Sequence, residues 1–321
     1  MKKLFSLLLL TLTLLSCERI PLYERETGVY LKINIRVNTQ ITTPGDTHAE
    51  EVKPEKMQVN FYDAETHALV SKFYVAPEGG FIDIAPGLYD VIIYNIDTEQ
   101  THVVNGNSSR GQVYAYTDFE TTEMPANWRS ANNNTTPDGA HIIREPDHLY
   151  VARMERVHIP ERSSQDETME LYAEASSILE TYTFRATNIT NIKDANVIKA
   201  YITGQVRGRY LWDNHYPAEA VAITFNCQVD QASNEIRTVF NTFGKFPNAV
   251  NTVYLHLFVG SSYDKGREYV FDVTEQFDDP DNTSHQIIVT EEINVPEAGS
   301  GNGGFSPNIK DWESENENID I

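Results

Sequence analysis

The sequence has little cysteine and a marked shortage of positive charge. Only Cys17 and Cys227 occur among 321 residues, so a framework of disulfides is excluded. Lysine and arginine number 25 against 47 aspartates and glutamates, which gives a formal net charge of -22. A surface of this sign repels nucleic acid and anionic lipid headgroups, so we expect neither to be bound by charge.

Long helical patterns are also missing. No stretch keeps an apolar period of 3.6 residues over three turns, whereas short runs of alternating polar and apolar residues recur along the chain. In the clearest run, the apolar residues are Val29, Leu31, Ile33, Ile35 and Val37. Such alternation is typical of strands with one buried face. The chain is longer than one core usually organises, so the sequence predicts an all-β protein of two tandem β-sandwich domains.

The one long apolar run lies at the N-terminus, from Leu4 to Leu15 behind Lys2 and Lys3. Twelve helical residues reach about 18 Å, well short of a ~30 Å hydrocarbon core, so we interpret the run as an export signal. The small Ser16 before Cys17 resembles a bacterial lipobox, which predicts cleavage between these residues and acylation of Cys17 with chains such as palmitate. The alternative is an ordinary secretory signal that happens to end in cysteine. Acylation on two or three chains would hold the protein stably at a membrane.

The order of segments follows from these patterns. We expect a signal peptide over residues 1–16, a tether over 17–27, an N-terminal sandwich over 28–159 and a C-terminal domain over 160–321. Residues 299–304 are a flexible linker by composition. After them, Phe305, Trp312, Ile319 and Ile321 are spread through acidic residues. We expect part of this terminal segment to pair as a strand, either with its own domain or with a partner.

Few residues suggest chemistry. Cys227 shares strand parity with Val221, Ile223 and Phe225, which favours a core position over a nucleophile. His256 alternates with Leu255 and Leu257, so we expect it to face solvent. No nucleophile elbow or phosphate-binding glycine loop is present, and the sequence predicts neither an enzyme nor a cofactor.

Metal sites are weakly indicated. The spacing of His141, His148 and His158 includes no helical i, i+4 pair, and scattered surface histidines explain it better than a ligand set. The run 278–281 offers three aspartates, but it lacks the alternating ligands and central glycine of a calcium loop. We expect a solvated turn there and no bound metal.

Several short motifs resemble a group of Bacteroides-type lipoproteins that is similar to the fimbrillins, the pilin and pilus-anchor proteins of those bacteria. The motifs are residues 17–19 with 21–23 after the lipobox, 84–89, 148–152, 311–312 and 319–321. The resemblance implies two transthyretin-like, Greek-key β-sandwiches in tandem. It also implies a lipid-anchored position at the outer face of the outer membrane, with fimbrial subunits or another surface protein as partners and adhesion or fimbria assembly as the function.

One departure from that family bears on mechanism. The resemblance implies that polymerising fimbrillins lose their first strand to an arginine-specific protease, which opens a groove for the next subunit. Here no arginine lies between Arg36 and Arg110, and the loop over residues 38–55 offers only Lys53. We therefore expect an anchor, tip or accessory subunit that keeps its lipid and assembles by strand addition. The segments for such exchange are the strand from Val29 to Val37 and the terminal segment.

A second hypothesis is a surface lipoprotein that binds a glycan or a protein and belongs to no fimbria. Trp128, Trp212 and the tyrosine-rich strands would then supply stacking surfaces.

Overall fold

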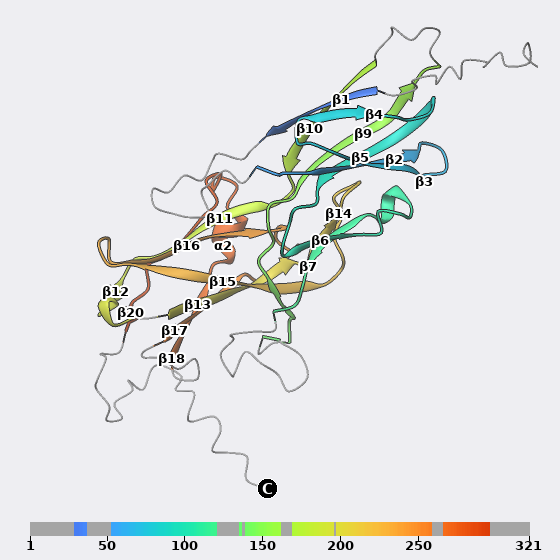
Figure 1. Cartoon of the computed structure of the whole chain (residues 1–321). Coiled ribbons are helices and arrows are strands. Elements are labelled where there is room, and N and C mark those ends of the chain that lie inside the picture. The colour runs from blue at the N-terminus through green and yellow to red at the C-terminus, as the bar shows by residue number, and fades with distance from the viewer. Residues whose placement is uncertain are drawn as a thin grey trace, which may run out of the picture.

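The computed structural model describes residues 29–36, 53–120, 135–136, 139–161, 169–195, 197–258 and 266–295 (Figure 1). Within these ranges strands are the main regular element and helix is rare. The first of them, β1 (Val29–Arg36), buries Val29, Leu31 and Ile33 and exposes the residues between them. Alternation therefore selects the buried face of β1 as the sequence predicts.

Seven strands form the first sandwich, along the path β3-β2-β5-β9-β10-β1-β4. Strands β9 and β10 pair at only two positions, so the path folds there into a four-stranded and a three-stranded sheet. A turn between Ala76 and Gly79 joins β3 to β4 and brings the two ends of the path together. The bounds are β2 (Met57–Asp63), β3 (Leu69–Val75), β4 (Gly79–Ile82), β5 (Gly87–Asn95), β9 (Tyr150–Ile159) and β10 (Met169–Ser177).

The second sandwich follows the path β18-β17-β13-β15-β16-β11-β19. Strand β15 takes part in both sheets of this sandwich. Its residues 220–227 pair with β13, and its residues 228–230 pair with β16. The bounds are β11 (Glu180–Ala186), β13 (Val197–Val206), β15 (Ala220–Asp230), β16 (Glu235–Thr242), β17 (Thr252–Phe258), β18 (Gly266–Asp272) and β19 (Gln286–Val289), with β12 (Ile189–Thr190) and β20 (Ile293–Asn294) as a small parallel pair.

The two sandwiches share one topology. In each, the first strand lies between the fourth, which is antiparallel to it, and the seventh, which is parallel to it. These neighbours are β4 and β10 for β1, and β16 and β19 for β11. The other sheet has the order third, second, fifth, sixth in both cases. This is the transthyretin arrangement, and it confirms the predicted fold class.

Strand pairing crosses residue 160, the boundary expected between the domains. Strand β10 follows that residue but completes the first sandwich, whereas β8 (Ile142–Arg144) precedes it and pairs with β15 of the second. Strand β14 (Gly208–Tyr210) joins β7 (Tyr114–Thr117) and β6 (Thr101–Val104) in a three-stranded sheet. The division of the chain into folding units stays a prediction.

A third apolar cluster lies where the two sandwiches meet. It combines Tyr62, Ile92 and Tyr94 of the first sandwich with Leu211 and Phe243 from the second half of the chain. Strand β2 consequently buries both of its faces, with Phe61 in the first core and Tyr62 in this interface cluster. The sandwiches are thus joined by packing as well as by the chain.

The expectation for His256 is wrong, because its side chain is buried and only 1% exposed. On β17, Leu255 and Leu257 enter the second core, and His256 lies on the opposite face in register with Lys199 of β13. Other side chains on that face are buried as well, since Ile142 of β8, Tyr201 and Ala222 form a cluster there. Parity gave the correct face, but both faces of this sheet are buried.

Helix is scarce in the described ranges. They contain the α-helix α2 (Thr274–Asp278) and the 3-10 turns η2 (Arg110–Gln112) and η4 (Ile192–Asp194). None of the described helices has the length and apolar character needed to cross a membrane.

Candidate functional site

The candidate strand-exchange segment β1 is fully integrated in the first sandwich. All eight of its residues are in register with β10, and four of them are in register with β4. Val29, Leu31 and Ile33 are buried in the first core, and Ile35 packs against it from a half-buried position. The fifth residue of the predicted set, Val37, lies outside the described residues. Strand β1 therefore fills the space between β4 and β10.

Gly79 on β4 makes this close approach possible. A Cβ atom at Gly79 would stand 1.9 Å from the carbonyl oxygen of Leu31, and the φ of Gly79 is +103°, which L side chains rarely adopt. Glycine is thus required where β4 meets β1.

The outer face of β1 carries charged pairs with β10. Lys32 Nζ lies 2.7 Å from Glu170 Oε1, and Arg36 pairs with Glu174. The hydrogen bond to Glu170 raises the pKa of Lys32, and the same bond lowers the pKa of Glu170. These groups are exposed to solvent, so they guide register more than they add stability.

Aromatic rings on this face are unusually exposed. Tyr30 of β1 and Phe81 of β4 are each 47% exposed and meet edge to face at 5.4 Å between ring centroids. Tyr172 of β10 is 66% exposed, and Lys32 Nζ lies 5.2 Å from its ring centroid. We call Tyr30, Phe81 and Tyr172 the aromatic patch. In the sequence, Tyr30 and Tyr172 alternate with the apolar residues that fill the core. This alternation could have marked them as rings that point outward.

The tryptophans proposed for stacking behave differently. Trp212 is half-buried against the interface cluster, and the Arg110 guanidinium lies 3.9 Å from its ring centroid. Arg110 in turn lies 3.0 Å from the buried carboxylate of Asp90. Trp212 therefore packs at the interface between the two sandwiches and is not an exposed stacking surface. Trp128 lies outside the described residues.

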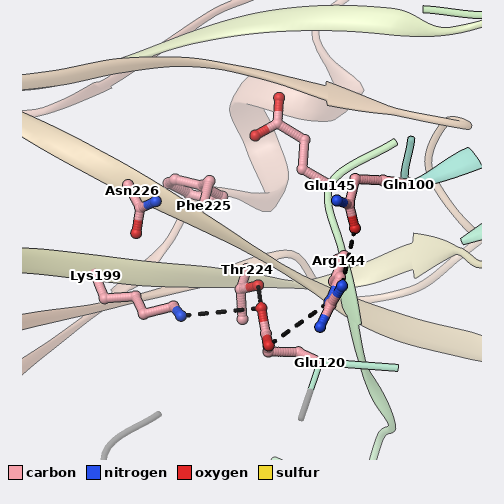
Figure 2. A pocket seen from close by; sticks show the side chains of 8 residues that line it. All are labelled: Gln100, Glu120, Arg144, Glu145, Lys199, Thr224, Phe225 and Asn226. Atoms are coloured by element: carbon pink, nitrogen blue, oxygen red, sulfur yellow. Dashed lines mark hydrogen bonds and ion pairs between the residues drawn. The ribbon is translucent and has the colours of Figure 1, made fainter. Parts of the chain in front are cut away.

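A polar cavity of about 360 Å³ lies where β8 meets the second sandwich (Figure 2). The Glu120 carboxylate stands between two cations, 3.8 Å from Arg144 Nε and 3.9 Å from Lys199 Nζ. Arg144 also donates to Gln100 Oε1 at 3.1 Å, and Thr224 Oγ1 donates to Glu120 at 3.5 Å. Sequence reasoning missed this cavity, because its residues come from five separated segments.

Cys227 and the aspartates of residues 278–281, which the sequence offered as candidates for a nucleophile and a calcium site, make structural contacts. Cys227 packs half-buried against the second core, and burial raises the pKa of its thiol, which disfavours the thiolate that a nucleophile needs. Asp278 pairs with Lys245, and Asp279 accepts a hydrogen bond from the backbone N–H of Asp281 at 2.9 Å.

The histidines considered as ligands lie apart. His141 Nε2 is 3.8 Å from a Glu219 oxygen, the ring of His148 stacks near Tyr150, and His158 is in register with Leu88 of β5. In the described ranges no three His, Cys, Asp or Glu side chains gather closely enough to hold a metal ion.

Other predicted site residues fall outside the described ranges. They are the lipidation and cleavage residues Ser16 and Cys17 and the terminal residues Phe305, Trp312, Ile319 and Ile321. Their roles stay predictions.

Comparison with solved structures supports the fold. A protein of Bacteroides ovatus described as an adhesin matches with a TM-score of 0.56 at 17% identity, over 85% of this chain and 95% of that one. The fimbrial anchor protein Mfa2 of Porphyromonas gingivalis gives a TM-score of 0.44 at 13% identity, over 81% and 88% of the two chains. The first match extends over both sandwiches, so their tandem arrangement recurs in a solved structure.

Sequence comparison gives two further matches. A Bacteroides ovatus protein named as a fimbrium anchoring subunit, Fim4B, is 25% identical over 131 residues, which are 41% of this chain. The match spans about a third of that protein, 35% of its length. The model of a domain of unknown function, DUF5119, matches residues 45–226, more than half of the sequence. The chain therefore belongs to the DUF5119 family.

Proposed function

We propose that this protein is a non-enzymatic lipoprotein of the bacterial outer membrane, exposed at the cell surface, that serves a fimbria as an anchor, tip or accessory adhesion subunit. The observation that carries the proposal is the position of β1. It is a complete strand of the first sandwich, and in the sequence it comes shortly after the tether that we expect to begin at Cys17. The names of two relatives, a fimbrium anchoring subunit and an adhesin, support the same role.

The proposal includes retention of β1 after export. The strand contributes three buried side chains to the first core, and no arginine follows it before Arg110. A covalent link from the lipid to the folded body is then kept, as an anchor requires. Partners would join by strand addition, in which a strand of one protein pairs with a sheet edge of another. The terminal segment over residues 305–321 is the candidate donor.

The test is a comparison of wild type with Cys17→Ala in the native host. Wild type should take up a palmitate analogue, fractionate with outer membrane and keep the lipidated cysteine as its first residue, because the lipobox predicts that modification. Cys17→Ala should lose the label and leave the membrane fraction. Affinity purification of wild type after surface crosslinking should recover a fimbrial subunit.

Two results would contradict this function. An unlabelled wild type would remove the lipid anchor, and a new amino terminus within residues 38–56 would place the protein among subunits that lose their first strand.

The aromatic patch favours one alternative, a surface lipoprotein that binds a glycan without a fimbria. Exposed tyrosine and phenylalanine rings beside Lys32 and Glu170 offer stacking and hydrogen bonding to a sugar. Replacing Tyr30 and Tyr172 with serine should then abolish binding on a glycan array, and affinity purification of wild type should recover no fimbrial subunit. Equal binding by wild type and the variant would discard this alternative.

A further inference from the structure

The outer edge of β19 is covered by two side-chain amides. In the described part of the second sandwich, β19 ends the sheet path and pairs on one side with β11. Ile287 and Val289 are buried, whereas Gln286 and Ile288 direct their backbone groups away from β11. An edge of this kind ordinarily presents N–H and C=O groups that another strand can bind.

Gln276 occupies the first pair of these groups. Its Nε2 donates to the carbonyl oxygen of Ile288 at 2.9 Å, and its Oε1 accepts from the N–H of Ile288 at 2.7 Å. Asn282 does the same at Gln286, donating to its carbonyl oxygen at 2.8 Å and accepting from its N–H at 3.0 Å. Each carboxamide thus takes the place of one residue of an antiparallel neighbour. We call Gln276 and Asn282 the amide latch.

The amide latch is built partly on a very short helix. Gln276 belongs to α2, which has five residues, no fully buried residue and no side-chain cap, and which packs against the second core through Phe277. So short a helix has little stability of its own. Asn282 Nδ2 also donates to the backbone carbonyl oxygen of Gln276 at 2.9 Å, which couples the two halves of the latch. An incoming strand would exchange these hydrogen bonds for equivalent ones, so opening the latch costs little net bonding.

Charge determines which strand fits. Residues 274–295 contain six acidic side chains and no lysine or arginine. The terminal segment over residues 305–321 carries five acidic residues and one lysine, so like charge disfavours it at this edge. A second copy of the chain would bring two such acidic edges together. A strand with basic side chains is the complementary occupant.

We infer that the edge of β19 is an acceptor for an antiparallel strand of another protein that carries basic side chains, and that Gln276 and Asn282 latch it until that strand binds. The inference depends neither on the lipid anchor nor on the fimbrial role.

The test uses Gln276→Ala/Asn282→Ala, the single variant Gln276→Met, and Gln112→Ala/Gln231→Ala as a control that removes two exposed amides elsewhere. The probe is a ten-residue peptide that alternates lysine with valine. We expect the double variant to bind it about tenfold tighter than wild type and the control to match wild type. Gln276→Met keeps the length of the side chain without its hydrogen bonds, so it should bind more tightly than wild type even if the double variant fails to fold.

Hydrogen exchange locates the binding. The amides of Gln286 and Ile288 should exchange faster in the latch variants than in wild type, and the peptide should restore their protection. A peptide methylated on alternate backbone nitrogens, or one with glutamate in place of lysine, should not bind. Equal affinities of wild type and latch variants, insensitivity to backbone methylation, or self-association of the double variant at low salt would each overturn the inference.

Discussion

His256 is a buried imidazole whose protonation opposes folding. Burial lowers its pKa from 6.5 to about 4 in the folded protein. As the pH falls below 6.5, the unfolded chain binds this proton while the folded chain does not, so the folded state loses stability. Above pH 6.5 the imidazole is neutral in both states and costs no stability. The loss of unfolding free energy grows as the pH falls from 6.5 towards 4.

We therefore predict that wild type loses about 3 kcal/mol more unfolding free energy than His256→Gln between pH 7 and pH 4. Urea titrations of both proteins at several pH values measure the difference. Parallel stability curves would show that His256 is protonated as easily in the folded protein as in the unfolded one.

Cys227 gives a second prediction at the scale of one residue. Its thiol packs against the second core and has a raised pKa, so little thiolate forms at neutral pH. In a Cys17→Ala background, where Cys227 is the sole cysteine, a maleimide should react slowly with the native protein and fast in urea. Rapid native labelling would mean that the strand face of Cys227 opens readily.

The alternation of residues along a strand predicts which face a side chain lies on, but not whether that face is buried. Alternation placed Cys227 correctly and chose the right face for His256, but it does not say what covers that face. Ile142 and Tyr201 are buried on the same face, and their meeting depends on β8 pairing with a strand almost eighty residues later. The polar cavity around Glu120 was missed for the same reason.

At the scale of elements, the seating of β1 depends on Gly79. We predict that Gly79→Ala lowers the unfolding free energy by about 2 kcal/mol or more, because the new Cβ meets the Leu31 carbonyl and the backbone is strained. Gly111→Ala is the matched control, since nothing lies within 4 Å of a Cβ there. Thermal melts of the two variants decide the matter, and equal melting temperatures would show that β4 shifts without cost.

The elements themselves were largely predictable, whereas their neighbours were not. A period of two revealed β1 and gave close bounds for β15. It carries no information about partners, and Lys32 meets Glu170 across 138 residues of sequence. The transthyretin order came from resemblance to a family, since parity alone is compatible with many sandwich topologies.

At the scale of the whole molecule, the interface cluster packs the two sandwiches against each other, so we expect them to unfold together. We predict a single calorimetric transition for wild type and two for Leu211→Ala, which opens a cavity between the sandwiches at a cost of about 2–5 kcal/mol. Leu171→Ala removes the same atoms from the first core and should lower the melting temperature with one transition retained. Two transitions in wild type would mean that the sandwiches unfold independently.

The parallel pairing of β1 with β10 has a mechanical consequence. A pull on the residues before Val29 acts along the axis of β1, and the rest of the molecule resists it through β10 and β4. The hydrogen bonds of eight register pairs then carry the load together in shear and do not open one after another. If the protein is tethered at its N-terminus and pulled by flow or by a bound partner, β1 should therefore resist a larger force than a strand whose hydrogen bonds open one at a time.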